Sequence, residues 1–339
     1  MLVVRTAKDE DVDQLYELIQ ESTYGLTTLK ITKDQLLERV EQSQYAFTHS
    51  WRRPTGQPYV FVMEDMRSGH VVGTCSIYSK VGGFEPFYSY RIETSIHQSK
   101  MLNVRREIKM LHLYKEHNGP TEIGSLFLSP KYRGQGVGRL LSMSRFLYMA
   151  EFPERFDEET IAEMRGNVSA DGFSPFWDAI GAHFFEIEFP QAETLTTVSK
   201  SFIAELMPPH PIYIPLLPKT AQETIGKVHT DTEPALVLLK KEGFQHRDLI
   251  DIFDGGPVVH CATSQIRVVR ESKSAEVVSI AESLEDCKPV LISNCQKEFR
   301  VCLGCLTADA GKATIDRVTA LELKLKVGSK LRYVPLRPS

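Results

Sequence analysis

The sequence predicts an α+β protein in which a mixed sheet is flanked by helices. Up to about residue 265, short apolar runs typical of strands alternate with amphipathic segments typical of helices. Beyond Arg270 the sequence consists mainly of short runs typical of strands, such as AEVVSIA, KPVLISN and FRVCLGCLTA. We therefore expect two parts, a main domain of mixed helices and strands over residues 1–265 and a small β-rich subdomain over residues 266–339.

The N-terminal third predicts a strand, two helices and a hairpin. MLVVRTA is typical of a buried strand, and DEDVDQLYELI follows with helical spacing and an acidic first turn. TKDQLLERVEQS predicts a second helix with Thr32 as its N-cap. YVFVMED and VVGTCSIYS, separated by MRSGH, predict an antiparallel hairpin.

The middle of the chain predicts further strands and helices. TEIGSLFL is a strand closed by Pro130, GRLLSMSRFLYMAEF a long helix, and IAEMRGNV another strand. SPFWDAIGAHFFEIEF predicts a helix and then a strand, and TEPALVLLKKEGFQHRDLIDIF repeats this helix, glycine, phenylalanine and strand order. A duplicated α–β unit is one interpretation. Between the two copies, residues 191–231 form a proline-rich insertion that cannot be one regular element.

Composition excludes several classes of function. The net charge of -4 and pI of about 6.2 do not fit a general nucleic-acid binder. We expect no membrane segment, because no apolar run approaches the roughly 20 residues that span a bilayer. The six cysteines do not resemble a disulfide framework, and a cytoplasmic location is expected. The pair Cys302 and Cys305 raises the possibility of zinc, but it lies in an apolar strand, so we expect no metal.

The stretch RGQGVG directly precedes the long helix. Because Gly134, Gly136 and Gly138 have no side chains, the unpaired N–H groups of the helix N-terminus could reach a diphosphate directly. Arg133 and Val137 lie beside these glycines and belong to the same candidate site. The P-loop is excluded, because Gly-Lys-Ser/Thr does not end this stretch. The dinucleotide fingerprint also fails, since it needs a parallel βαβ unit.

R-x-x-G-x-G resembles the pyrophosphate loop of the GCN5-related N-acyltransferase superfamily, whose element order this chain also follows. The resemblance implies that coenzyme A's diphosphate binds this loop. It also implies that the preceding strand is splayed, so that the backbone of Leu126, Phe127 and Leu128 pairs with the pantetheine arm. An acyl-CoA would then be a co-substrate rather than a tightly bound cofactor.

Further motifs narrow the resemblance. GLTTL, SLFLSP, SRFLYMAEFPERF, AEMRG, SPFWDAIGAHFF, FIAELMPPHPIY, IGKVH and LIDIFDGGP together resemble the arginine N-succinyltransferase family. This implies succinyl transfer from succinyl-CoA to the α-amino group of L-arginine, giving N2-succinylarginine and CoA, the first step of the arginine succinyltransferase catabolic pathway. The alternatives are ornithine or another basic amino acid as acceptor, another acyl donor, or one subunit of a two-subunit enzyme. The resemblance thus implies a homo-oligomer or a hetero-oligomer with a related subunit.

The chemistry requires a neutral amine, stabilisation of the thioester oxygen and a proton for the leaving thiolate. Among the histidines, the resemblance places the proton donor at His229 in IGKVH, and His97 is a second candidate for contact with substrate. The superfamily uses direct attack by the amine, so no cysteine nucleophile is expected.

The charges of the two substrates suggest further candidates. The succinyl carboxylate calls for an arginine, for which Arg91 and Arg165 are candidates. The guanidinium of arginine calls for a carboxylate, for which Glu163, Asp251 and Asp254 are candidates. The sequence leaves these choices open.

Overall fold

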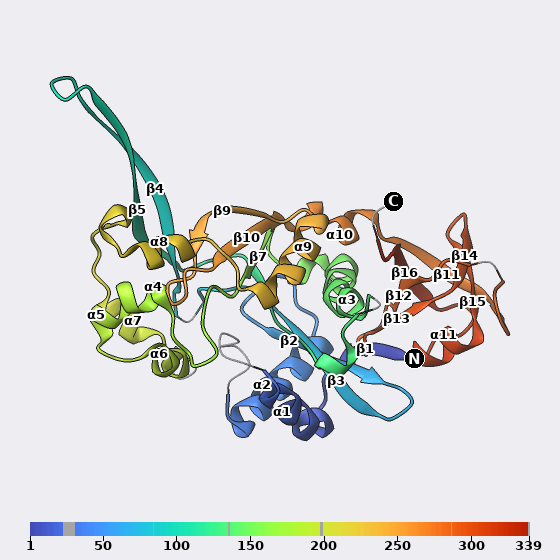
Figure 1. Ribbon diagram of the computed structural model, residues 1–339. Helices are drawn as coiled ribbons and strands as arrows, with labels where there is room; N and C mark the ends of the chain where they lie inside the picture. Colours follow the sequence, from blue (N-terminus) through green and yellow to red (C-terminus); the bar gives the residue numbers. More distant parts are fainter. Residues whose placement is uncertain (23–30, 84, 135, 197–198, 286, 338–339) are drawn as a thin grey trace.

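The computed structural model describes residues 1–22, 31–83, 85–134, 136–196, 199–285 and 287–337. Within them, strands join into a single sheet, ordered β14-β15-β11-β16-β12-β13-β1-β2-β3-β6-β7-β10-β9-β4-β5-β8. Helices flank the central strands (Figure 1). This arrangement confirms the predicted α+β class. The GLTTL motif lies outside the described residues.

The N-terminal elements match their prediction closely. Thr32 caps the second helix, accepting a hydrogen bond from the Gln35 N–H (3.2 Å) while the Gln35 side chain accepts from the Thr32 N–H (2.9 Å). The hairpin is antiparallel, as expected. The bounds are β1 Leu2–Thr6, α1 Val12–Gln20, α2 Lys33–Thr48, β2 Pro58–Asp65, β3 His70–Tyr78, β6 Thr121–Leu128, α3 Val137–Glu151 and β7 Glu159–Glu163.

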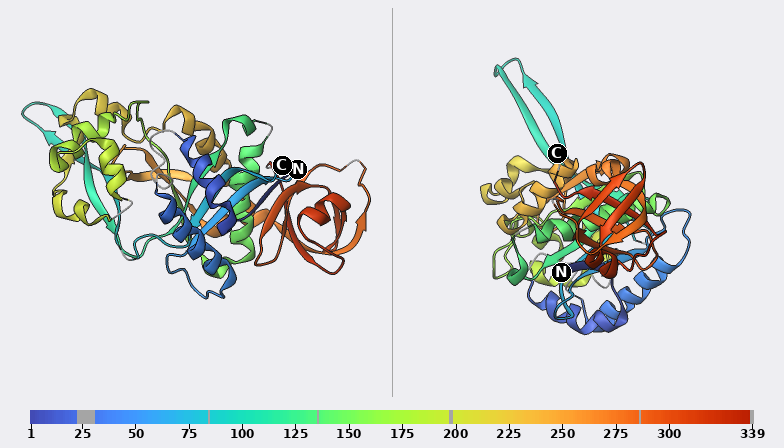
Figure 2. Two further views of the ribbon diagram at one scale, coloured as in Figure 1. Left: turned by 90° about the horizontal axis from the view of Figure 1, so that it is seen from below. Right: turned by 90° about the vertical axis from the view of Figure 1, so that its right-hand side faces the viewer.

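Between β3 and β6 the chain forms a long hairpin that the sequence did not predict. β4 (Phe87–Ser99) pairs with β5 (Val104–Glu116) along its whole length. β9 joins β4 at Tyr90 and Arg91, and β8 joins β5 at Met110 and Leu111. Beyond these contacts the hairpin projects from the body as an arm (Figures 1 and 2).

The duplicated α–β unit is not supported. The second copy is present as a helix and a strand, α9 and β9. In the first copy, α5 ends at Phe185, Glu186 adopts a left-handed conformation (φ 55°), and another helix begins at Phe189 instead of the expected strand. The bounds here are α4 Pro175–Ala179, α5 Gly181–Phe185, α6 Phe189–Thr196, α7 Ser201–Leu206, β8 Ile212–Tyr213, α8 Lys219–Thr224, α9 Glu233–Glu242, β9 Gln245–Ile250, β10 Pro257–Ala262 and α10 Arg267–Glu271.

The C-terminal part is β-rich, as expected, and continues the same sheet. β13 pairs antiparallel with β1, with Val3 opposite Cys302. One disulfide, between Cys287 and Cys305 (Cα–Cα 5.8 Å), was not predicted. The bounds are β11 Lys273–Ala281, β12 Val290–Asn294, β13 Arg300–Gly304, β14 Leu306–Asp309, β15 Lys312–Asp316, α11 Arg317–Glu322 and β16 Lys330–Pro335.

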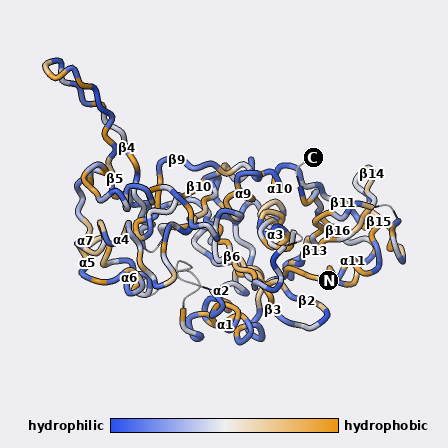
Figure 3. Tube along the Cα trace, in the orientation of Figure 1, coloured by the Kyte–Doolittle hydropathy of each residue, from blue (hydrophilic) through white to orange (hydrophobic). Residues whose placement is uncertain are grey.

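α3 lies at the centre of the main hydrophobic core. Its ten residues Leu140–Met149 are all buried, among them Phe146, Leu147 and Tyr148. Figure 3 shows hydrophobic residues along this helix and the neighbouring strands. Because the core fixes α3 against β6, the turn between them is held in place. Among the described helices, none is long and apolar enough to cross a membrane.

Candidate active site

β6 and β7 begin as a parallel pair and then separate. Their pairing is limited to Thr121 with Thr160 and Glu122 with Ile161. Beyond Glu122, the edge of β6 that faces β7 has no strand partner among the described residues, while its other edge pairs with β3 up to Leu128. A splayed strand of this kind leaves backbone groups that an extended ligand can pair with. This is the geometry that the sequence resemblance implied.

A bulge lies in the middle of this strand. The register between β3 and β6 shifts after the Ser76–Gly124 pair, and Ser125 adopts a positive φ of 50°. A non-glycine residue in this conformation is uncommon and typical of functional sites. The bulge redirects the backbone just where the two strands part.

The glycine turn joins the splayed strand to α3, and each glycine has a reason. Gly134 (φ 101°) and Gly136 (φ 84°) have left-handed conformations that other residues adopt at a cost. Gly138 is helical, and a Cβ there would have Leu128 Cδ2 as its nearest neighbour, 4.0 Å away. Its lack of a side chain therefore leaves open space at the helix N-terminus, which favours an anion. Arg133 borders this space, with its Nε–H donating to the Leu128 carbonyl (3.2 Å).

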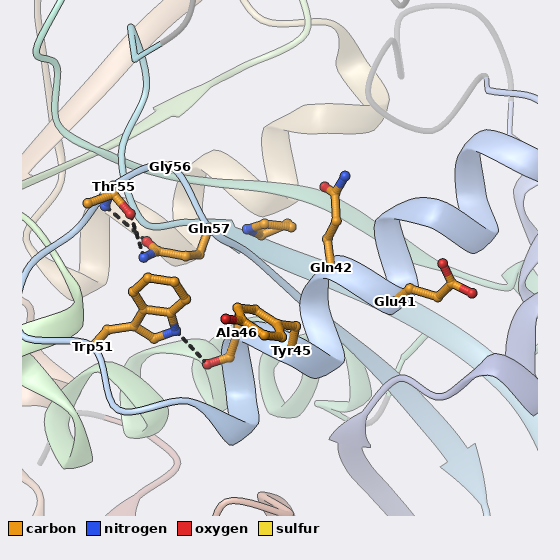
Figure 4. Close-up of a pocket in the computed structure, with 9 residues that line it drawn as sticks. Glu41, Gln42, Tyr45, Ala46, Trp51, Thr55, Gly56 and Gln57 are labelled. Atoms are coloured by element: carbon orange, nitrogen blue, oxygen red, sulfur yellow. Dashed lines mark hydrogen bonds between the residues drawn. The ribbon is translucent and has the colours of Figure 1, made fainter.

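A cavity of about 680 Å³ follows the gap between the strands. Its lining joins the splayed strand, the arginine of the glycine turn and the far end of β7. The lining includes Glu122, Gly124, Ser125, Leu126, Phe127, Arg133, Arg145, Glu163, Arg165, Lys200, Asp251 and Asp254. A separate, more open hollow of about 440 Å³ lies beside α2, where Trp51 donates to the Ala46 carbonyl (Figure 4). None of the predicted site residues that the structure describes lines that hollow.

Carboxylates gather at one end of the cavity. Glu122 on β6, Glu163 at the end of β7 and Asp251 after β9 all line it, with Lys200. Desolvation in the cavity raises the pKa of Glu122 and Asp251. The pKa of Glu163 is raised well above its usual value by desolvation and then by the negative charges of Asp251 and Glu122, although the side chain itself reaches solvent. A cation bound here would relieve this repulsion.

Asp254 has a structural task. Its two carboxylate oxygens accept from the N–H groups of Gly166 (2.6 Å) and Gly256 (2.8 Å), and it is 6% exposed. It therefore holds the turn after β7 against the turn before β10. Its charge still acts on Arg165, because Asp254 and Asp231 oppose the lowering of the Arg165 pKa by burial.

His229 does not line the cavity, but it contacts two residues that do, Arg165 and Asp231. Its backbone N–H donates to the carbonyl of Arg165 (2.9 Å), and its Nδ1 accepts from the N–H of Asp231 (3.1 Å). In the neutral ring the proton is therefore on Nε2. Burial and then Arg165 lower the pKa of His229.

Two predicted substrate-binding residues lie on the arm instead. Arg91, at its base, is exposed and stacks over Tyr114 (4.1 Å). His97 is further out, opposite Arg106 and exposed. Neither lines the cavity in the described part of the chain, so the geometry does not support these predictions. The reason is that residues 87–116 form one projecting hairpin.

Sequence reasoning missed Glu122, Lys200 and Arg145 as cavity residues. The residues around Glu122 and Lys200 form no motif or unusual pattern that would predict a place in the cavity. Arg145 stands in an unusual pattern, because it is a charged residue inside the apolar helix LLSMSRFLYM.

Comparison with known proteins identifies the family. Residues 2–268 match the family described as arginine N-succinyltransferase beta subunit, and residues 273–335 match the C-terminal domain of that subunit. The chain belongs to the arginine N-succinyltransferase beta subunit family. The resemblance drawn from the sequence is thereby confirmed.

Individual relatives of this family are similar over their full length. The chain is 41% identical to the arginine N-succinyltransferase of Salmonella typhi over 339 residues, covering 99% of this chain and 98% of the relative. It is 42% identical to arginine N-succinyltransferase subunit beta of Pseudomonas aeruginosa over 337 residues, with the same coverage. Among solved structures, arginine/ornithine succinyltransferase subunit AI of Pseudomonas aeruginosa matches with a TM-score of 0.90 and 34% identity, covering 100% of this chain and 99% of that one.

Proposed function

We propose that this chain is an N-succinyltransferase that moves the succinyl group of succinyl-CoA to the α-amino group of L-arginine. The products are N2-succinylarginine and CoA, as in the first step of the arginine succinyltransferase catabolic pathway. One observation carries the proposal: Arg133 of the glycine turn and a cluster of carboxylates line the same cavity, in a chain about 41% identical to enzymes of this name. The cavity thus suits an anionic donor and a cationic acceptor together.

The donor would bind along β6. Arg133 and the N–H groups at Gly134, Gly136 and Gly138 would hold the diphosphate at the positive end of α3. Val137 would act through the turn itself, because its N–H donates to the Gly134 carbonyl (3.0 Å). The free edge at Leu126, Phe127 and Leu128 would pair with the pantetheine arm. The thioester would then lie near the bulge at Ser125.

The acceptor would bind at the acidic end. Glu163 is the strongest candidate for the guanidinium, because it lies in the cavity with a carboxylate that accepts no hydrogen bond from the described residues, and Asp251 lies beside it. Asp254, by contrast, would act through the turn that it holds. Glu122, on β6 itself, would accept the proton of the α-ammonium, since its raised pKa makes it a better base than an ordinary carboxylate.

The reaction would be a direct attack. The neutral amine adds to the thioester carbon, the C–S bond breaks and the thiolate leaves with the electron pair. Backbone N–H groups at the bulge would stabilise the oxyanion. The proton that the attacking nitrogen loses as the amide forms would pass to the thiolate. His229 would assist by donating a hydrogen bond to the thiolate from Nε2–H, the nitrogen left available by the Asp231 hydrogen bond.

A thiol-release assay tests this function. We expect the fastest turnover with succinyl-CoA and L-arginine, compared with acetyl-CoA as donor and ornithine as acceptor. Faster turnover with acetyl-CoA would overturn the donor, and faster turnover with ornithine would favour the alternative acceptor. Turnover that appears only when a related subunit is added would assign the chain to a two-subunit enzyme.

We also propose that the chain forms an oligomer through the arm, with a second copy or a related subunit. Two strands alone are marginally stable in water, and the arm exposes Met101 (91%) and Leu102 (67%). Replacing residues 93–108 by a short turn should lower the mass measured by light scattering. An unchanged mass would reject this role.

Two other assignments remain proposals. We retain a catalytic domain over residues 1–265 and a subdomain over residues 266–339, on the change from mixed to β-rich structure. We propose a cytoplasmic location, because four of the six cysteines, Cys75, Cys261, Cys295 and Cys302, are free thiols, as is usual in a reducing compartment. The disulfide between Cys287 and Cys305 is the exception.

A further inference from the structure

Arg145 is a buried cation in the main hydrophobic core. It lies in the middle of α3 and is 2% exposed, yet its side chain reaches the lining of the cavity. Arginine is almost never fully buried unless it is paired. Its guanidinium keeps its charge, because the pKa of arginine is far above neutral pH even where burial lowers it, as it does here.

All the hydrogen bonds of this guanidinium in the described residues go to neutral oxygens. Nε donates to the Ser142 carbonyl (3.1 Å), one terminal nitrogen to Ser142 Oγ (2.9 Å) and the other to the Gly124 carbonyl (3.4 Å). No carboxylate of the described residues forms an ion pair with Arg145. An uncompensated buried charge is costly, so its presence needs an explanation.

The other buried arginines of the fold differ from Arg145. Arg5 pairs with Asp11 at 2.7 Å, and Arg267 pairs with Glu242 at 2.8 Å. Arg155 donates to backbone carbonyls and to Tyr148 Oη, and it does not line the cavity. Arg145 therefore combines two features, a buried guanidinium without an acidic partner and a place on the cavity wall.

Its position relative to the splayed strand indicates the missing partner. Gly124, which accepts from Arg145, directly precedes the bulge at Ser125, where the thioester is proposed to lie. An acyl chain that starts there and carries a second carboxylate could bring that carboxylate to the guanidinium. The alternatives are weaker, because Arg165 already has Asp254 and Asp231 as acidic neighbours and Arg91 lies on the arm.

We propose that Arg145 binds the terminal carboxylate of the succinyl group and selects a dicarboxylic acyl donor over a neutral one. This inference rests on the proposed acyl-CoA function. The ligand supplies the counter-ion that the protein lacks, so a donor without a carboxylate would leave the charge unpaired. Discrimination by a missing buried partner is stronger than discrimination by size alone.

The test compares succinyl-CoA with butyryl-CoA, which has the same chain length without the charge. In Arg145→Met we expect kcat/KM for succinyl-CoA to fall at least about 100-fold while kcat/KM for butyryl-CoA stays within a few-fold. Arg145→Lys should recover part of the selectivity. Arg155→Met is the matched control, since it removes a buried guanidinium outside the cavity and should leave the ratio of the two donors unchanged.

The outcomes separate this proposal from the function on which it rests. If the wild-type protein does not prefer succinyl-CoA, the proposed donor fails. If it does, but Arg145→Met lowers both donors equally, Arg145 is structural and the inference is overturned. Should Arg145→Met not fold, the donor ratio of Arg145→Gln decides, because a folded variant that lacks the charge and keeps wild-type selectivity would also overturn the inference.

Discussion

The cavity has two walls that differ in charge and in construction. The wall proposed to bind the donor, called the donor wall, consists of β6 with Arg133 and Arg145, and α3 begins beside Arg133 with the positive end of its dipole. The acceptor wall consists of the ends of β7 and β9, and it presents Glu163 and Asp251. One wall is built by backbone geometry and the core, the other by side chains at strand ends.

The difference in charge between the two walls would direct the two substrates to different sides of the cavity. The donor carries phosphates and a carboxylate, and the acceptor carries a guanidinium, so each is attracted to one wall and repelled by the other. Changes to one wall should therefore alter the kinetics of one substrate. The expected change in kinetics decreases from Gly138→Asp to His229→Ala and then to Glu163→Gln, and the expected effect of pH is smaller still.

Gly138→Asp should have the largest effect. It places a negative side chain in the space where the diphosphate is proposed to bind. Repulsion between two adjacent like charges costs several kcal/mol of binding free energy, which corresponds to a loss of roughly 1000-fold in kcat/KM for succinyl-CoA. The fold should survive, because a Cβ at Gly138 has its nearest neighbour at 4.0 Å and an acidic residue suits a helix N-terminus.

Steady-state kinetics and a melting curve check this prediction. The control is Ser68→Asp, which adds the same charge at an exposed residue of the β2–β3 turn. An unchanged KM for succinyl-CoA in Gly138→Asp would break the assignment of the donor wall.

His229→Ala should lower kcat by about 100-fold, the usual contribution of a positioned acid or base. The KM of both substrates should change little, because His229 does not line the cavity and belongs to neither wall. His70→Ala, an exposed histidine in β3, is the control. An unchanged kcat across pH would remove His229 from the chemistry.

Glu163→Gln should raise the KM for L-arginine by about 10- to 100-fold, which corresponds to the loss of one charge-assisted hydrogen-bonded pair. The KM for succinyl-CoA should stay within about two-fold, because the change affects the acceptor wall alone. Glu276→Gln, an exposed strand residue on β11, is the control. Equal changes in both KM values would contradict the separation of the walls.

The donor wall could be predicted from the sequence because its signals are local. Glycines before an apolar helix report on backbone conformation, and both Gly134 and Gly136 have the positive φ that requires them. The apolar periodicity around them also placed β6 and α3 correctly.

The acceptor wall could be predicted much less well. Glu122, Lys200 and Asp251 come together only through the order of the strands and the position of the helical insertion. No short stretch of sequence predicts either of these two features. His97 and Arg91 were misplaced for the same reason. Both residues lie on β4, which pairs with β5 along its whole length. This pairing places both residues on the arm, away from the cavity.

The smallest predicted effect concerns pH. The folded protein raises the pKa of Glu163 and Glu122 above the ordinary glutamate value of about 4.3. A raised carboxyl pKa means that these groups favour the folded state below the unfolded pKa, and that this stability is lost as pH rises through the folded pKa. Binding of a guanidinium works in the opposite direction, because it needs the ionised carboxylates.

We therefore expect the increase in melting temperature produced by L-arginine to grow by a few degrees as pH rises through the raised pKa values, while the melting temperature without ligand falls. Differential scanning calorimetry between pH 5 and pH 8 measures both. Glu163→Gln should flatten the two trends, since it removes the group with the larger shift. A stabilisation by L-arginine that is independent of pH in the wild-type protein would show that the guanidinium binds away from Glu163, and would leave the acceptor wall with a role in folding alone.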